Sequence, residues 1–168
     1  MNSKQIVAAI GVVALIVILA YPALSNGSVT IVAQSVRIGN ADHVYVTVNS
    51  ILAHEKGQSI SDWKLVTNQS QSIDLIALAT STRVLATGHL PAASYDAMRI
   101  SISNVTWVFN KTTTTLPVTI SDLDANLDFT MGAGGALSIT LTISGHPETV
   151  GPSKFFVASL NATLPQAP

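Results

Sequence analysis

Apolar and polar residues alternate with a period of two through most of the chain after Ser28. In the segment Ile139-Thr140-Leu141-Thr142-Ile143, an extended strand would place Ile and Leu on one face and Thr on the other. Because β-branched residues recur and no window shows an apolar repeat of about 3.6 residues, strands are predicted and helices are not. The predicted strands span residues 29–38, 43–53, 63–67, 73–78, 83–86, 95–109, 116–121, 126–131, 136–144 and 154–164.

Turn-forming residues separate these segments. Gly, Asn, Asp and Pro gather at residues 39–42, 56–58, 88–91, 132–135 and 145–152. About eight to ten short strands at this spacing predict an all-β fold, a single antiparallel β-sandwich of immunoglobulin-like or Greek-key type. No internal repeat or linker interrupts the pattern, so residues 26–168 are expected to form one domain.

The N-terminus follows a different pattern. Lys4 precedes an unbroken apolar run over residues 6–20, and small residues follow up to Ser25. This layout predicts that residues 1–25 are an export signal peptide or an N-terminal membrane-anchor helix. The run reaches about 22 Å as a helix, less than a ~30 Å bilayer core, whereas its extension to Leu24 would just span one. Cleavage after Ser25, a retained anchor and a pilin-type helix cut near Lys4 are the three alternatives.

Composition excludes several classes of protein. Only 10% of the 168 residues are charged, against about 25% in an average soluble domain, and 8 Lys plus Arg nearly balance 9 Asp plus Glu. This balance provides no basic stripe for nucleic acid, and the absence of cysteine excludes disulfides and thiolate metal sites. Ser and Thr supply 35 of the 168 residues, so hydroxyl groups must hydrate most of the surface.

The number of Asn-x-Ser/Thr motifs indicates a location outside the cell. Five of nine asparagines begin the motif Asn-x-Ser/Thr, where chance alone gives about two. Together with the export segment, this excess predicts an extracellular, N-glycosylated protein of the cell surface. The predicted glycosylation sites are Asn26, Asn68, Asn104, Asn110 and Asn161.

One short segment carries the only candidate metal ligands. Its oxygen-bearing side chains stand at every second position, as in the first half of a calcium loop. They are Asp122, Asp124, Asn126 and Asp128. A calcium loop requires Gly and Glu where the chain has Leu127 and Ala133, so the favoured interpretation is a strand whose acidic residues face water. Neither a metal nor a cofactor is predicted.

No group of residues indicates catalysis, and an enzyme is not expected. Neither a Gly-x-Ser-x-Gly elbow nor a recognisable pair of carboxylates is present, and the histidines lack metal-ligand spacing. The histidines are His43, His54, His89 and His146. Trp63 and Trp107 are interpreted as strand-core residues rather than sugar-stacking platforms. Asp74 and Arg99 each lie within an apolar strand, and we predict that they form a structural ion pair across the sandwich.

Six short motifs follow one another in order through the middle of the chain. They are Val44-Tyr45-Val46-Thr47-Val48, Ala53-His54-Glu55, Trp63-Lys64-Leu65-Val66, Ser72-Ile73-Asp74-Leu75-Ile76-Ala77-Leu78, Leu90-Pro91-Ala92-Ala93-Ser94-Tyr95 and Met98-Arg99-Ile100. Their series resembles an uncharacterised family of exported β-sandwich domains, a domain of unknown function frequent in bacterial and archaeal surface lipoproteins. The resemblance covers roughly residues 29–160 and implies fold and location but no catalytic residue. Ala93 replaces a glycine of that family, and the absence of a lipobox cysteine excludes lipid anchoring.

Tyr95 closes the fifth of these motifs, directly after a turn. We predict that its ring packs in the core while its hydroxyl group finds a backbone partner, as corner tyrosines of sandwiches do.

The strand that follows the export segment is a candidate for assembly. Val29, Ile31 and Ala33 share one face, and the pattern then shifts to Val36 and Ile38, which predicts a bulge near Ser35. Such a strand either closes its own sandwich or fills the groove of the next copy by donor-strand addition. Head-to-tail donation of this kind gives an open filament.

These observations predict a structural protein that associates with itself, as a filament or pilus subunit of archaeal type. The alternative is a membrane-anchored surface module that binds a glycan or solute. Its contacts would be Trp63, Trp107 and the acidic row at residues 122–128.

Overall fold

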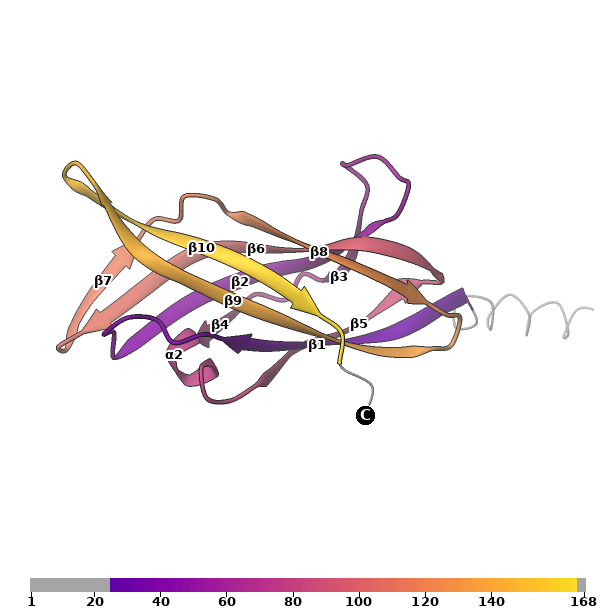
Figure 1. Ribbon diagram of the computed structural model, residues 1–168, viewed down its shortest axis with the longest axis horizontal. Helices are drawn as coiled ribbons and strands as arrows, with labels where there is room; N and C mark the ends of the chain where they lie inside the picture. The colour runs from indigo at the N-terminus through magenta and orange to yellow at the C-terminus, as the bar shows by residue number, and fades with distance from the viewer. Residues whose placement is uncertain (1–24, 166–168) are drawn as a thin grey trace, which may run out of the picture.

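Ten strands and one short helix follow one another along residues 25–165, the part of the chain that the computed structural model describes (Figure 1). The expected all-β fold is confirmed, with 71% strand and 4% helix. The elements are β1 Asn26–Ser35, β2 His43–Glu55, β3 Trp63–Thr67, β4 Gln71–Asp74, α2 Leu75–Leu78, β5 Arg83–Pro91, β6 Ala93–Phe109, β7 Thr112–Leu116, β8 Asp122–Met131, β9 Ala136–Val150 and β10 Ser153–Thr163.

The strands form two sheets. Sheet A has the order β10-β9-β1-β5. Sheet B has the order β3-β2-β6-β7, with β4 also paired to β2 and β8 also paired to β6. β3 and β4 pair with different stretches of β2, and β7 and β8 with different stretches of β6. The two long strands β2 and β6 are therefore the centre of sheet B.

The core lies between the sheets. Alternate residues of strands such as β1 and β8 are buried there, as the period of two requires. Side chains with 0% exposure include Ile31, Ile139, Leu141 and Phe156 of sheet A and Val46, Met98 and Ile100 of sheet B. Each such side chain contributes about 1.5–3 kcal/mol relative to an exposed position.

The expectation of a purely antiparallel sandwich is wrong at one interface. β1 runs antiparallel to β5 but parallel to β9. The turn before β9 lies beside the start of β1, since the Ser28 amide donates to the Gly135 carbonyl at 2.8 Å and the Gly134 amide to the Asn26 carbonyl at 2.9 Å. Both strands therefore leave the same end of the sandwich, which makes them parallel.

The turns predicted at residues 88–91 and 145–152 are wrong for the most part, because β5 continues to Pro91 in its pairing with β1 and β9 continues to Val150 in its pairing with β10. Two predicted strands also differ from the structure. Residues 73–78 split into the end of β4 and the single turn α2, because the Asp74 carboxylate caps the helix by accepting from the Ile76 amide at 3.0 Å. Residues 117–121 are a loop rather than part of a strand, and β7 ends before Pro117, which has no amide hydrogen to donate. The Pro117 carbonyl instead accepts from the Phe156 amide of β10 at 2.9 Å.

The predicted inner face of the first strand is mostly confirmed. Val29, Ile31 and Ala33 are 0% exposed, and Ile38 is buried in the loop that follows. Val36, however, is 50% exposed, so its assignment to the inner face is wrong. The irregularity in β1 lies between Ile31 and Val32, where β1 pairs with β5, and the bulge expected near Ser35 is also wrong. β1 ends at Ser35, and the alternation ends with it.

The prediction for Tyr95 is confirmed. Its side chain is fully buried, its ring stacks on Phe129 with 4.9 Å between centroids, and its hydroxyl group donates to the Pro91 carbonyl at 2.9 Å. Burial, with a smaller contribution from Glu55, raises the pKa of Tyr95 to about 12.

Candidate functional site

A cleft of about 700 Å³ opens on the outer face of sheet B. Strand register places its residues in one row, because His54 of β2 lies opposite both Trp63 of β3 and Ala97 of β6, and Ala97 lies opposite Asn126 of β8. The loop of residues 56–62 connects β2 to β3 and rises above the body in Figure 1. Ile60 of this loop lines the cleft and is 88% exposed.

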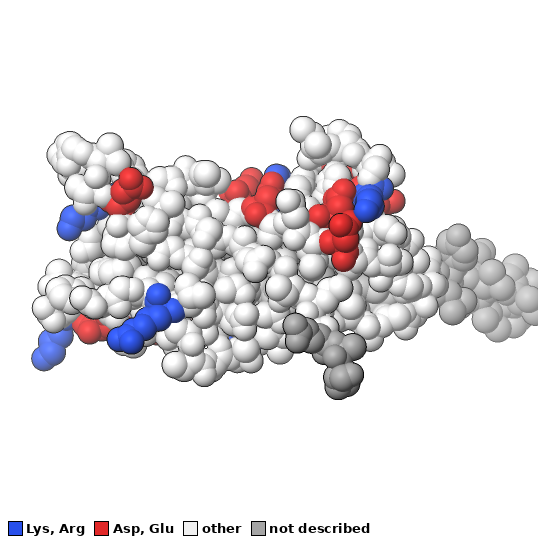
Figure 2. All heavy atoms as spheres, viewed as in Figure 1, with Lys and Arg blue, Asp and Glu red and all other residues white. Residues whose placement is uncertain are grey.

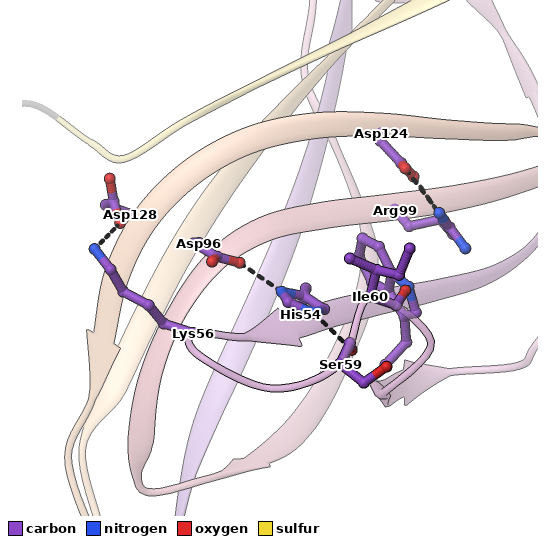
Figure 3. A network of polar contacts seen from close by, with 9 residues as sticks. His54, Lys56, Ser59, Ile60, Asp96, Arg99, Asp124 and Asp128 are labelled. Carbon is purple, nitrogen blue, oxygen red and sulfur yellow. Dashed lines mark hydrogen bonds and ion pairs between the residues drawn. The ribbon is translucent and has the colours of Figure 1, made fainter.

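His54 connects the loop to the sheet. Its Nδ1 lies 2.7 Å from a carboxylate oxygen of Asp96, and its Nε2 lies 3.0 Å from the Ser59 carbonyl oxygen (Figure 3). Both neighbours accept hydrogen bonds, so both contacts are satisfied together only when the imidazole is protonated. The hydrogen bond to Asp96, followed by the one to Ser59, raises the pKa of His54 above its ordinary value of 6.5.

Arg99 forms the second polar contact of the cleft. Its Nε and Nη2 donate to the two carboxylate oxygens of Asp124 at 2.6 and 2.7 Å. Its guanidinium carbon lies 4.1 Å from the centre of the Trp63 ring, a cation–π contact. The Trp63 indole also donates to the Ile60 carbonyl at 2.9 Å, so Trp63 is held by both the sheet and the loop.

The charges of the cleft cancel in pairs. Lys56 donates to Asp128 at 2.8 Å, beside the His54–Asp96 and Arg99–Asp124 contacts (Figure 3). This contact raises the pKa of Lys56. Acidic and basic atoms also lie side by side on the face shown in Figure 2, and most of that face carries no charged residue. The cleft therefore presents no excess of either charge.

The predicted ion pair between Asp74 and Arg99 is wrong. Asp74 lies 2.6 Å from the Nδ1 of His43 and also accepts from the Val44 amide at 3.2 Å. Arg99 lies opposite Asp124 in the register of β6 and β8 and pairs with it. Both pairs lie outside the core, where strand neighbours decide which charges meet.

The calcium hypothesis is not supported. The four residues of the acidic row are exposed at alternate positions of β8, so successive side chains stand about 6.6 Å apart along one face and do not converge on one ion. Three of them already have partners: Asp122 accepts from Ser101 at 2.6 Å, and Asp124 and Asp128 bind the cations described above. Within residues 25–165, no cluster of three or more His, Cys, Asp or Glu side chains is able to hold a metal.

The two tryptophans differ in environment. Trp107 is partly buried and packs against the core, in agreement with its prediction, whereas Trp63 lies in the cleft and its core assignment is wrong. The contact between His54 and Asp96 is not predictable from the sequence, because 42 residues separate the two side chains. The acidic row is visible in the sequence, but its cationic partners are not.

Four predicted glycosylation sites are accessible. Asn68, Asn104, Asn110 and Asn161 are exposed, whereas Asn26 at the start of β1 is partly buried. Asn110 forms the tip of the β6–β7 hairpin with a φ of 47°. The structure thus leaves room for glycans at these four positions.

Residues 26–149 match a family model described as Domain of unknown function (DUF4382). The chain belongs to this family. The expected membership of an uncharacterised family is therefore confirmed. No curated protein and no solved structure matches the chain. The DUF4382 match includes every strand that contributes to the cleft and leaves β10 outside.

Proposed function

We propose that this DUF4382 protein is an exported structural protein of the cell surface whose copies assemble by exchanging β1. The position of β1 carries the proposal. It is a central strand of sheet A, it contributes three fully buried side chains to the core, and it directly follows the predicted export segment. Its removal would leave an open groove between β5 and β9.

The connection between β1 and β2 is suited to exchange. Residues 36–42 link the two strands, with Ile38 buried and Gly39 at a φ of 43°, a conformation favourable for glycine. A β1 from a second copy would make the contacts that the chain's own β1 makes, so exchange replaces equal interactions. Donation in one direction does not close on itself and extends into a filament.

The surface of the domain is consistent with an extracellular location. Four exposed sequons support N-glycosylation, and the scarcity of charge is compatible with hydration by Ser, Thr and glycans. Extracellular location, an archaeal pilus-like assembly and an immunoglobulin-like or Greek-key type of sandwich belong to the same proposal. It includes no catalysis, cofactor or nucleic-acid partner. No helix within residues 25–165 has the length and hydropathy to span a membrane, and the predicted signal or anchor helix lies almost entirely outside those residues.

Cysteine trapping tests the proposal, because the chain has no cysteine of its own. Thr30 of β1 and Thr87 of β5 are register partners and project outward, so Thr30→Cys with Thr87→Cys should form a disulfide on oxidation. If β1 is exchanged, this bond joins different chains, and assembled protein gives a ladder of covalent multimers on a non-reducing gel. The matched control is Ser144→Cys with Ser159→Cys, whose hydroxyl groups lie 2.7 Å apart within the β9–β10 hairpin. The control should give only monomers.

Strand exchange is rejected if both double variants give only intrachain disulfides in protein taken from the cell surface and in concentrated purified protein. The single variants Thr30→Cys and Thr87→Cys identify multimers that arise from random oxidation.

A second candidate function is a surface module that binds a glycan or solute. One observation favours it: Trp63 and part of the acidic row, which are far apart in the sequence, meet in a single cleft. A structural subunit and a binding module are compatible roles for one domain.

A further inference from the structure

The cleft exists because a small residue lies at its centre. Ala97 lies between His54 and Asn126 in the row across β2, β6 and β8. Its methyl group forms the floor, and the larger side chains beside it form the walls. At about 700 Å³, the cleft is within the range of about 300–1,000 Å³ that is usual for small-molecule sites.

The wall charges argue against an ionic ligand. Each of the three cations that line the cleft binds a carboxylate of the same cleft, at 2.6 to 2.8 Å. A phosphate or other anion would have to displace a carboxylate, and a metal ion would have to displace a cation. When His54 is protonated, as its two acceptor contacts require, the six charges that line the cleft sum to zero, so neither sign is attracted from a distance.

Several polar atoms nevertheless remain available. Within residues 25–165 the side-chain amide of Asn126 makes no hydrogen bond, and only one of the two carboxylate oxygens of Asp96 is bound by a side chain. Arg99 uses Nε and Nη2 and retains the donors of Nη1. Planar amide, carboxylate and guanidinium groups are able to bind two adjacent hydroxyl groups at once.

The cleft also offers apolar contact. Ile60 of the loop has 88% of its surface exposed, and Trp63, whose indole donates to the Ile60 carbonyl, lines the same cleft. A sugar ring combines hydroxyl groups at its rim with C–H groups on its faces, and both kinds of contact are present here. A neutral ligand rich in hydroxyl groups satisfies the free polar atoms without breaking an ion pair.

We propose that this cleft binds a neutral oligosaccharide, with Asn126, Asp96 and Arg99 contacting its hydroxyl groups and Ile60 contacting the face of a ring. The inference deepens the second candidate function. It does not depend on strand exchange, because the cleft consists of residues from β2, β3, β6, β8 and the loop, and none from β1. Failure of either test leaves the other intact.

Calorimetric titration of the full chain tests this site. The neutral probes are maltotriose, cellotriose, mannotriose and chitotriose, and trigalacturonate is the anionic probe. Ala97→Leu fills the floor and should weaken binding of a neutral probe by about tenfold or more, as should Asn126→Ala, which removes a hydroxyl contact. The matched control is Ala136→Leu, an exposed alanine of β9 on sheet A, which should leave binding unchanged. Thermal unfolding verifies that each variant is folded.

Three results would overturn the proposal. The first is that none of the four neutral probes binds at millimolar concentration. The second is that a probe binds but both cleft variants bind it as well as the unaltered chain does. The third is that trigalacturonate binds more tightly than every neutral probe. Asn126→Ala keeps the test decisive if Ala97→Leu fails to fold, because Asn126 is exposed and outside the core.

Discussion

The imidazole of His54 and the carboxylate of Asp96 lie 2.7 Å apart and join β2 to β6 beside the loop that lines the cleft. The second ring nitrogen binds the carbonyl of Ser59 within the loop. Other charged groups on the neighbouring elements are Glu55 of β2, Lys56 and Asp62 of the loop, Lys64 of β3, Arg99 of β6, and Asp124 and Asp128 of β8. Protonation of one side chain thus connects the loop to β6.

We expect this connection to weaken as the pH rises. The pKa of His54 is raised above 6.5 in the folded protein by Asp96 and Ser59. Its stabilising contribution is therefore complete below about pH 6.5 and is lost as the pH rises through the folded-state pKa. His54→Gln should lower the melting temperature at about pH 5 to 6, and the difference from the unaltered chain should shrink toward about pH 9. His89→Gln, an exposed histidine of β5, is the control, and a pH-independent difference for His54→Gln would contradict the assignment.

Arg99 should be energetically coupled to Asp124 and not to Asp74. A double-mutant cycle with Arg99→Met and Asp124→Leu should give a coupling of about 0.5–1 kcal/mol, because the contact is bidentate but its side chains are 27% and 47% exposed. The same cycle with Asp74→Leu should be additive, since Asp74 binds His43 instead. Chemical denaturation measures both cycles. Coupling to Asp74 equal to that with Asp124 would be incompatible with the structure.

Gly88 should not tolerate a side chain. A Cβ atom at Gly88 would overlap the Val66 carbonyl, where β5 lies against β3. Gly88→Ala is expected to lower the free energy of unfolding by about 1–3 kcal/mol. Gly132→Ala is the matched control, because a methyl group at this position would have no neighbour within 4 Å, and it should change stability by less than about 0.5 kcal/mol. Equal effects of the two substitutions would show that packing at Gly88 is not the cause.

Tyr95 should make the domain sensitive to alkali. Its folded-state pKa of about 12 exceeds the ordinary value of 10, so the unfolded chain loses this proton first and stability falls between about pH 10 and pH 12. Tyr95→Phe should destabilise the domain by about 0.5–1.5 kcal/mol at neutral pH through the lost bond to Pro91. The variant should then lose less stability above about pH 10. Tyr45→Phe, at a partly exposed position, serves as the control.

Glycans are expected on at least two of the four exposed sequons, Asn68, Asn104, Asn110 and Asn161. Mass spectrometry of protein from its native host measures occupancy. Thr112→Ala should abolish occupancy of Asn110, and Thr112→Ser should retain it, because only a hydroxyl side chain completes the motif. A mass equal to that of the bare polypeptide would contradict this prediction.

Local patterns predict what local physics decides. The alternation in β1 identifies Val29, Ile31 and Ala33 as core residues because the pleat of a strand fixes a period of two. The helix at residues 75–78 is not predicted, because four apolar residues fit a buried strand as well as a helical turn. Asp74, which precedes them, is nevertheless a good N-cap residue.

Contacts between distant segments are not predictable in the same way. The partners of Arg99 and Asp74 depend on which strands become neighbours, and the sequence of a single strand does not determine its neighbours. The parallel pairing of β1 with β9 and the cleft around Ala97 have the same origin, since both arise from strands far apart in the chain.

The placement of β1 has a mechanical consequence. Eight of its residues are register partners of β5 and eight are partners of β9, and its N-terminal end follows the predicted export segment in the sequence. Tension applied through that end acts along the strand and shears both ladders at once, so their hydrogen bonds share the load. The β9–β10 hairpin, pulled at its tip, would instead peel apart one bond at a time. If the predicted N-terminal segment anchors the protein, the load thus falls on the two ladders of β1 together rather than on one bond at a time.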